Sequence, residues 1–178
     1  MYTFIALFKG INVGGHNSLP MRELIEILEN LELENVRTYI QSGNVVFQST
    51  KHLSAGFSTD ISLAVENLKG FRPGVLLFSP NEFRAAIDEC PFSIDEGKLL
   101  HFFFLNEVPE EPDLESLEAL KSETEEYRLV NNVFYLYAPD GIGRSKLVAK
   151  VGKAMGVPGT ARNWNTVRKI LSLVDSVS

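Results

Sequence analysis

Short apolar runs alternate with helical patterns in the same order twice along the chain. In the first half, residues 2–8 form an aromatic-rich apolar run, and "VRTYIQSGNVVFQS" (36–49) predicts a hairpin. Apolar residues at helical spacing begin near 18–20 and return at 57–68, and "VLLF" (75–78) predicts the closing strand. Elements in this order form the β-α-β-β-α-β unit, which restricts the first half to a ferredoxin-like arrangement.

The second half repeats this order up to its last element. "LLHFFFL" (99–105) predicts a strand, a helix is expected near 113–121, and a second hairpin turns at Asn131-Asn132. A helix with Ser145 as its N-cap then runs from Lys146 to Met155, and a C-terminal helix stands in place of the last strand.

The repeated order predicts an α+β fold made of duplicated ferredoxin-like (β-α-β-β-α-β) halves with a C-terminal helix. Residues 1–79 form the first half, and residues 80–178 form the second half with the basic C-terminal helices. Because no low-complexity linker separates the halves, we expect them to pack as one compact unit.

The charge of the chain is distributed unevenly. The 178 residues carry a formal net charge of −6, yet residues 141–174 contain seven basic side chains and no acidic one. The rest of the chain therefore holds ten basic and 23 acidic side chains. Such segregation is typical of a surface that receives an anion, and the alternative is a solvated helical face.

Several classes of protein are disfavoured by the sequence. Apolar runs such as "FIALF" and "HFFFL" are far shorter than a membrane span, and the first ten residues lack the features of a signal peptide. Cys90 is the only cysteine, and no His/Cys cluster has metal-ligand spacing. We expect a cytoplasmic protein with no cofactor and no metal.

The first candidate loop is "KGINVGG" (9–15), between the first strand and the first helix. Gly10, Gly14 and Gly15 allow positive φ and close approach of the backbone to a phosphate. The loop matches neither G-x-G-x-x-G nor G-x-x-x-x-G-K-[ST], so as a nucleotide-binding motif it is weak. The alternative is a flexible connection.

The second candidate is "PDGIGRSK" (139–146), which also joins a strand to a helix. Free N–H groups at a helix start attract anions, and here Arg144 and Lys146 flank that start. Lys150 and Lys153 continue the same outer stripe along the helix. The alternative is a helix that is merely soluble.

The third candidate is "TARNWNTVRK" (160–169), which holds the only tryptophan. Asn163 or Thr160 can cap the last helix, with Arg162 and Asn165 around its exposed N–H groups. Trp164 falls on the buried face of that helix, so a core anchor is favoured over a stacking platform. We expect the two late helices to begin at a common, positively charged mouth.

The turn "QSGN" (41–44) combines residues that a ligand site uses with residues that a hairpin alone requires. No general acid–base pair can be named, so the catalytic residues are unknown. The candidate ligand-binding residues are Lys9, Asn12, Gly14, Gly15, Gln41, Ser42, Asn44, Arg144, Ser145, Lys146, Thr160, Arg162, Asn163, Trp164 and Asn165.

Four motifs in order, "FKGINVGGHN…PM", "VRTYIQSGNVVF", "PDGIGRSK" and "GTARNWNTVRK", resemble the bacterial proteins of domain-of-unknown-function 1697. The resemblance implies an α+β fold of ferredoxin-like character in a cytoplasmic bacterial protein, and it brings no established activity, substrate or catalytic residue. The family commonly has arginine where Lys9 stands and lysine where His16 stands, which weakens anion contacts at both positions.

Three functions are compatible with these features. The first is binding of a phosphorylated ligand, either a nucleotide or single-stranded nucleic acid, on the basic C-terminal surface. Aromatic residues on predicted strands could stack bases: Tyr39, Phe47, Phe102–Phe104, Tyr135 and Tyr137. The second is an enzyme that stabilises a small anionic substrate electrostatically, which requires the three loops to converge. The third is an interaction scaffold. The oligomeric state cannot be read from the sequence.

Overall fold

The computed structural model describes residues 1–54, 56–93 and 97–177, which form six helices and two four-stranded antiparallel sheets. The chain divides into two compact units: unit 1 is Met1–Ala85 with Arg168–Ser178, and unit 2 is Ala86–Val167. The prediction of an α+β fold is confirmed. Among the described residues, no helix has both the length and the apolar character that a membrane crossing requires.

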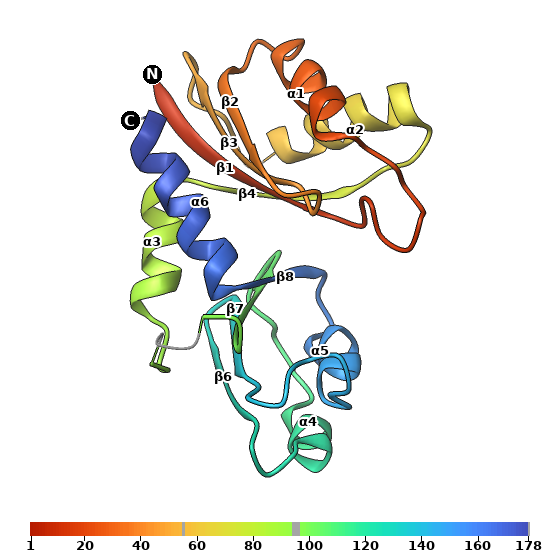
Figure 1. Ribbon diagram of the computed structural model, residues 1–178, viewed down its shortest axis with the longest axis vertical. Helices are drawn as coiled ribbons and strands as arrows, with labels where there is room; N and C mark the ends of the chain where they lie inside the picture. Colours follow the sequence, from red (N-terminus) through yellow and green to blue (C-terminus); the bar gives the residue numbers. More distant parts are fainter. Residues whose placement is uncertain (55, 94–96, 178) are drawn as a thin grey trace. The chain divides into compact units, whose positions relative to one another are not determined.

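Unit 1 is built on a sheet with the strand order β2-β3-β1-β4 (Figure 1). Its elements are β1 (Tyr2–Lys9), α1 (Met21–Glu29), β2 (Glu34–Tyr39), β3 (Asn44–Ser49), α2 (Phe57–Lys69), β4 (Gly74–Phe78), the first part of α3 (Pro80–Asp88) and the last part of α6 (Trp164–Val177).

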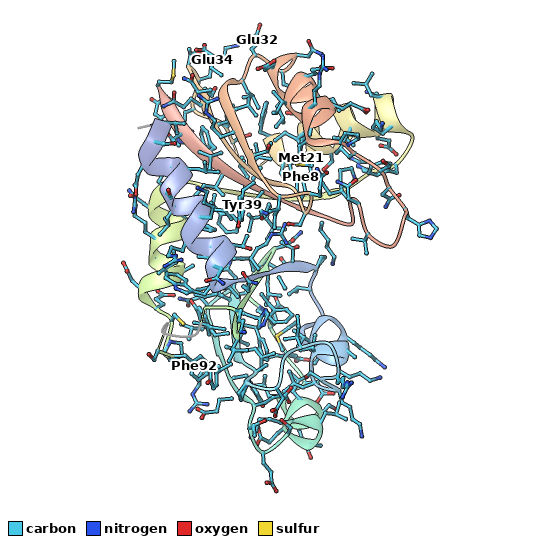
Figure 2. All side chains as sticks on the ribbon, in the orientation of Figure 1. Phe8, Met21, Glu32, Glu34, Tyr39 and Phe92 are labelled. Atoms are coloured by element: carbon cyan, nitrogen blue, oxygen red, sulfur yellow. The ribbon has the colours of Figure 1, made fainter. Side chains whose placement is uncertain are left out.

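Both faces of this sheet are buried. Phe4 and Phe8 of β1 pack with α1 and α2 in one core, to which Met21 also contributes (Figure 2). On the opposite face, Gln48 Nε2 donates to the carbonyl oxygen of Val177 at 2.6 Å, so the end of α6 covers that side. Strands buried on both faces are apolar at nearly every position, which explains the continuous runs in the sequence.

Unit 2 is built on a sheet with the strand order β6-β7-β5-β8. Its elements are the last part of α3, β5 (Leu100–Leu105), α4 (Leu114–Leu120), β6 (Glu126–Val130), β7 (Val133–Tyr137), α5 (Val148–Met155), β8 (Gly159–Asn163) and the first part of α6. Helices α4 and α5 cover one face, where Leu117 and Val151 pack with Phe134 and Leu136. The other face carries Phe102, whose ring lies 5.2 Å from that of Tyr135.

The prediction that a helix replaces the last strand of the second half is wrong. Residues Gly159–Asn163 form β8, which pairs antiparallel with β5, and α6 follows it. At Gly159 a Cβ would lie 2.6 Å from the carbonyl oxygen of Phe104, so the strand approaches β5 too closely for a side chain there. Helix α5 also begins later than predicted, at Val148 rather than Lys146.

Candidate functional site

The glycine loop of unit 1 adopts the left-handed backbone conformation that its glycines allow. Gly10, Gly14 and Gly15 have φ angles of +77°, +57° and +79°, in the left-handed region. No other atom lies within 4 Å of a Cβ built at any of the three, so the space beside them is open. Lys9 at the end of β1 is exposed as well. The loop therefore presents its backbone to solvent.

Asn12 is a structural residue within this loop. Its Nδ2 donates to the carbonyl oxygens of Leu19 and Gln41, both at 2.8 Å, and its Oδ1 accepts from Leu19 N at 2.8 Å. Both amide hydrogens and the amide oxygen are thus used. Asn12 joins the glycine loop to the β2–β3 turn, to which Gln41 contributes its backbone carbonyl.

Asn44 and Ser42 close the β2–β3 turn. Asn44 is buried, and its Nδ2 donates to Tyr39 O at 2.9 Å and to Ser42 Oγ at 3.0 Å. Ile40 in the same turn is exposed and has a φ angle of +51°, which is rare and strained for a β-branched residue. The turn is therefore built mainly by its own internal hydrogen bonds.

The loop before α5 places several cations at the surface of unit 2. Ser145 Oγ accepts from Val148 N at 3.1 Å and so caps the first turn of the helix. Arg144 and Lys146 precede this turn, and all the cations of the loop and of α5 are exposed. We define the basic surface as Arg144, Lys146, Lys150 and Lys153.

The basic surface has no neutralising carboxylate within ion-pair distance in the described parts of the chain. The ion pairs of the described residues involve other cations: Arg22, Lys51, Lys69, Arg72, Arg84 and Lys121. Asp113 has a pKa below its usual value, mainly because Ser116 donates hydrogen bonds to it, and in smaller part because of the charge of Lys153. The surface thus keeps its positive charge.

Arg162 lies in β8 with its side chain buried. Its Nη1 donates to Thr160 Oγ1 at 2.7 Å and to Ala161 O at 2.8 Å. Burial lowers the pKa of Arg162 to about 10, so the guanidinium is still charged at neutral pH. Arg162 pairs with Phe102 in the sheet and shares its face.

The start of α6 has the predicted cap. Asn163 Oδ1 accepts from Thr166 N at 3.0 Å. Trp164 is buried, and its ring stacks on Phe102 with 5.9 Å between the ring centroids. Asn165 is exposed, and its backbone N donates to Gly97 O at 3.3 Å. Trp164 is therefore a core anchor.

The expectation that α5 and α6 begin at a common mouth is wrong. Helix α5 packs on the face of the unit 2 sheet that carries Phe134 and Leu136. Trp164 packs on Phe102, on the opposite face, because side chains alternate along each strand and Phe103, not Phe102, lies opposite Phe134. The sheet separates the basic surface from Arg162 and Trp164.

Most of the aromatic residues considered for base stacking are in the core. Phe47, Phe102, Phe104 and Tyr135 have no exposed surface, and Phe103 packs against the cluster around Phe134. Neither sheet presents these rings as a platform, because helices or other side chains cover them.

Comparison with known proteins decides the family. Residues 1–135 match the family described as "Protein of unknown function (DUF1697)". The chain belongs to this family. The matched range contains the glycine loop and the β2–β3 turn, whereas "PDGIGRSK" and "GTARNWNTVRK" lie beyond it.

The DUF1697 chain is also similar to a solved structure, the conserved bacterial protein SP0830 from Streptococcus pneumoniae. The two share 26% sequence identity with a TM-score of 0.70, over 97% of this chain and 98% of that one. The similarity of fold therefore continues past the family match to the last helix. No curated protein matches the chain.

A buried histidine gives this DUF1697 protein an expected pH dependence. Burial lowers the pKa of His101 from its usual value of 6.5. As the pH falls below about 6.5, the unfolded chain takes up a proton that the folded chain resists. Stability from this residue is present above that pH and is lost on acidification.

We expect the urea midpoint of the wild type to fall between pH 7.5 and 5.5, and the variant His101→Gln to show a smaller fall. His16→Gln is the matched control, because His16 is exposed, and it should keep the wild-type slope. An unchanged slope in His101→Gln would assign the acid sensitivity to other groups.

Proposed function

We propose that this DUF1697 protein binds a phosphorylated ligand, either a nucleotide or single-stranded nucleic acid, through the basic surface of unit 2. The observation that carries the proposal is that its four cations are exposed and no described carboxylate pairs with them. Lys150 and Lys153 are three residues apart on α5, so their ammonium groups are neighbours. Clustered cations of this kind attract phosphate groups over several ångströms.

The burial of the aromatic residues narrows the mode of recognition. Of the candidate rings, only Tyr39, Phe103 and Tyr137 keep part of their surface exposed, so stacking on bases contributes little. Binding then depends on phosphate charge, and we expect little preference among bases.

The alternative function, an enzyme that stabilises a small anionic substrate, receives less support. Such an enzyme needs amide groups that are free to face the substrate, and Asn12 and Asn44 are among the candidates. The amides of both donate to backbone carbonyls within unit 1, so they are engaged in holding the loops. Lys9, Gly14, Gly15 and Gln41 are the proposed ligand-facing residues that remain exposed in that unit.

We also propose that the two units are a duplicated ferredoxin-like fold. Both follow the order β-α-β-β-α-β, and the first strand of each unit lies between the third and the fourth in its sheet. This arrangement supports the duplication.

The binding proposal is tested by fluorescence anisotropy with a labelled oligothymidine, with inorganic triphosphate as the competitor. If four phosphates are contacted, log K should fall with log salt concentration with a slope of about −3. We expect Lys150→Glu/Lys153→Glu to weaken binding at least about tenfold, since two attractive charges become repulsive.

Arg37→Glu/Lys98→Glu is the matched control, because it reverses two exposed cations outside the basic surface. It should retain most of the affinity. Equal losses in both double variants, or an affinity that does not respond to salt, would contradict binding at the basic surface.

A further inference from the structure

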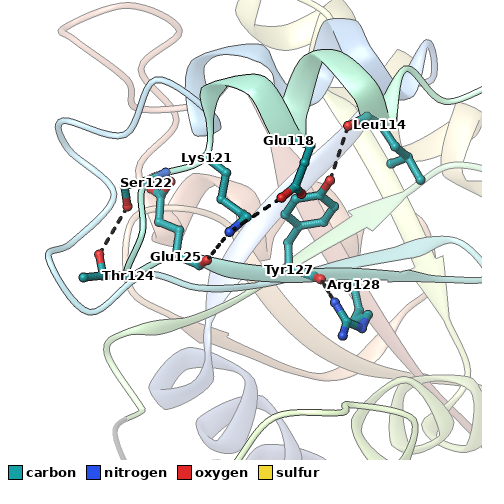
Figure 3. A network of polar contacts seen from close by, with 8 residues as sticks. All are labelled: Leu114, Glu118, Lys121, Ser122, Thr124, Glu125, Tyr127 and Arg128. Carbon is teal, nitrogen blue, oxygen red and sulfur yellow. Dashed lines mark hydrogen bonds and ion pairs between the residues drawn. The ribbon is translucent and has the colours of Figure 1, made fainter.

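Strand β6 is an edge of the unit 2 sheet. The sheet order β6-β7-β5-β8 gives it β7 as a neighbour on one side, and no strand of the described residues pairs with its other side. Its residues Tyr127 and Arg128 are shown in Figure 3, where β6 runs beside α4. An edge strand offers unpaired backbone groups that a further strand can use.

The register shows which backbone N–H and C=O groups of β6 make no hydrogen bond to β7. Leu105 N donates to Asn132 O at 2.8 Å, so even-numbered residues of β7 bond to β5 and odd-numbered residues bond to β6. Arg128 lies opposite Tyr135 and is therefore bonded to β7. Every second residue of β6, beginning with Tyr127, directs its N–H and C=O away from the sheet.

The edge at β6 is more regular than the edge at β2. The β6–β7 register runs without a shift from Glu126 to Val130. In β2 the register shifts between Glu34 and Arg37, and Asn35 has a φ angle of +52°. Irregularities of that kind twist an edge away from pairing, and β6 has none.

The charges on β6 are arranged so that two antiparallel copies of the strand place opposite charges side by side. Exposed Glu126 and Arg128 flank Tyr127 on the strand, two residues apart. We propose that β6 pairs antiparallel with β6 of a second copy of this chain, about a two-fold axis that passes beside Tyr127.

In this register Glu126 of each copy lies opposite Arg128 of the other, so the dimer contains the same charge pair twice. Directly opposite positions that are not hydrogen-bonded to one another have the shorter Cα separation, which brings these side chains together. Tyr127 directs its backbone groups outward and meets its own equivalent on the axis. A register centred on Arg128 would instead oppose two arginines and use groups that β7 already occupies.

The same arginine protects the edge in the single chain. Arg128 Nη1 donates to Tyr127 O at 2.9 Å, as the dashed line in Figure 3 shows. Pairing replaces this contact with a hydrogen bond from the second copy and frees the guanidinium for the carboxylate of Glu126. Because one short strand buries little surface, the dimer is weak and depends on concentration.

The test is sedimentation velocity from about 10 µM to about 1 mM, a range suited to weak association. The wild type should move toward a dimer as concentration rises. Glu126→Arg and Arg128→Glu each make both cross-strand pairs repulsive, so each should raise the dissociation constant by about tenfold or more.

An equal mixture of these two single variants restores attraction at both positions, and so does the double variant Glu126→Arg/Arg128→Glu. Both should associate as the wild type does, which also shows that the variants are folded. Glu34→Arg and Arg37→Glu on β2 are the matched controls and should leave the dimer unchanged. A wild type that stays monomeric across the range, or single variants that associate normally, would overturn the proposal, as would a mixture that fails to associate.

Discussion

Replacing Trp164 by alanine is expected to lower the free energy of unfolding by about 3–5 kcal/mol, the usual cost of removing a buried large aromatic ring. Trp164 is 7% exposed and stacks on Phe102, which itself is fully buried. The change removes the anchor at the first residue of α6 and leaves a cavity beside Phe102. Urea denaturation followed by far-ultraviolet circular dichroism measures the loss.

Two further variants separate packing from other effects. Trp164→Phe retains an aromatic ring against Phe102 and should lose less than half as much stability. Lys169→Ala changes an exposed position on the same helix and should stay within about 0.5 kcal/mol of the wild type. If Trp164→Ala were as stable as Lys169→Ala, the assignment of Trp164 to the core would be wrong.

The strands and helices of unit 1 could be predicted because their signals are local and strong. Every residue of β3 is buried, and its central apolar residues Val45–Phe47 directly follow a polar turn. Helix α1 repeats apolar residues at helical spacing, with Leu24 and Leu28 fully buried. A burial pattern can be read from the sequence when the apolar residues of one helix or strand make up the whole pattern.

Strand β8 could not be predicted because its residues show no such pattern of apolar residues. Its sequence, Gly-Thr-Ala-Arg-Asn, lacks apolar alternation, and its strand conformation depends on pairing with β5 far away in the chain. Such tertiary pairing overrides local preference. The cap at Asn163 was nevertheless predictable, since a cap is decided by the few residues around it.

The charge pattern could identify the cations but not their distribution over the fold. A charged side chain is expected at the surface, yet Arg162 is buried beside Phe102 and Thr160. Which face of a sheet a residue occupies depends on the register of the strand, and β8 was not recognised as one. The charge pattern of residues 141–174 therefore predicts a single basic surface, although Arg162 and the cations of α5 lie on opposite sides of the unit 2 sheet.

Replacing Gly43 by alanine is expected to cost about 2–4 kcal/mol, from left-handed backbone strain and from overpacking together. Gly43 has a φ angle of +72°, and its Cβ would lie 2.6 Å from both Ile11 Cδ1 and Phe8 Cβ. Phe8 N donates to Gly43 O at 2.8 Å, so the turn cannot move away without losing that bond. Thermal and urea denaturation both measure the effect.

Gly10→Ala is the matched control, because Gly10 has nearly the same φ angle, +77°, and no atom within 4 Å of its Cβ. It carries the backbone strain alone and should cost about 1 kcal/mol. The difference between the stability losses of the two variants is the energy of the close approach to Phe8 and Ile11. Equal losses would mean that these two side chains move aside without an energetic penalty. Because Gly43 lies in unit 1 and the basic surface in unit 2, folded Gly43→Ala should still bind oligothymidine as the wild type does.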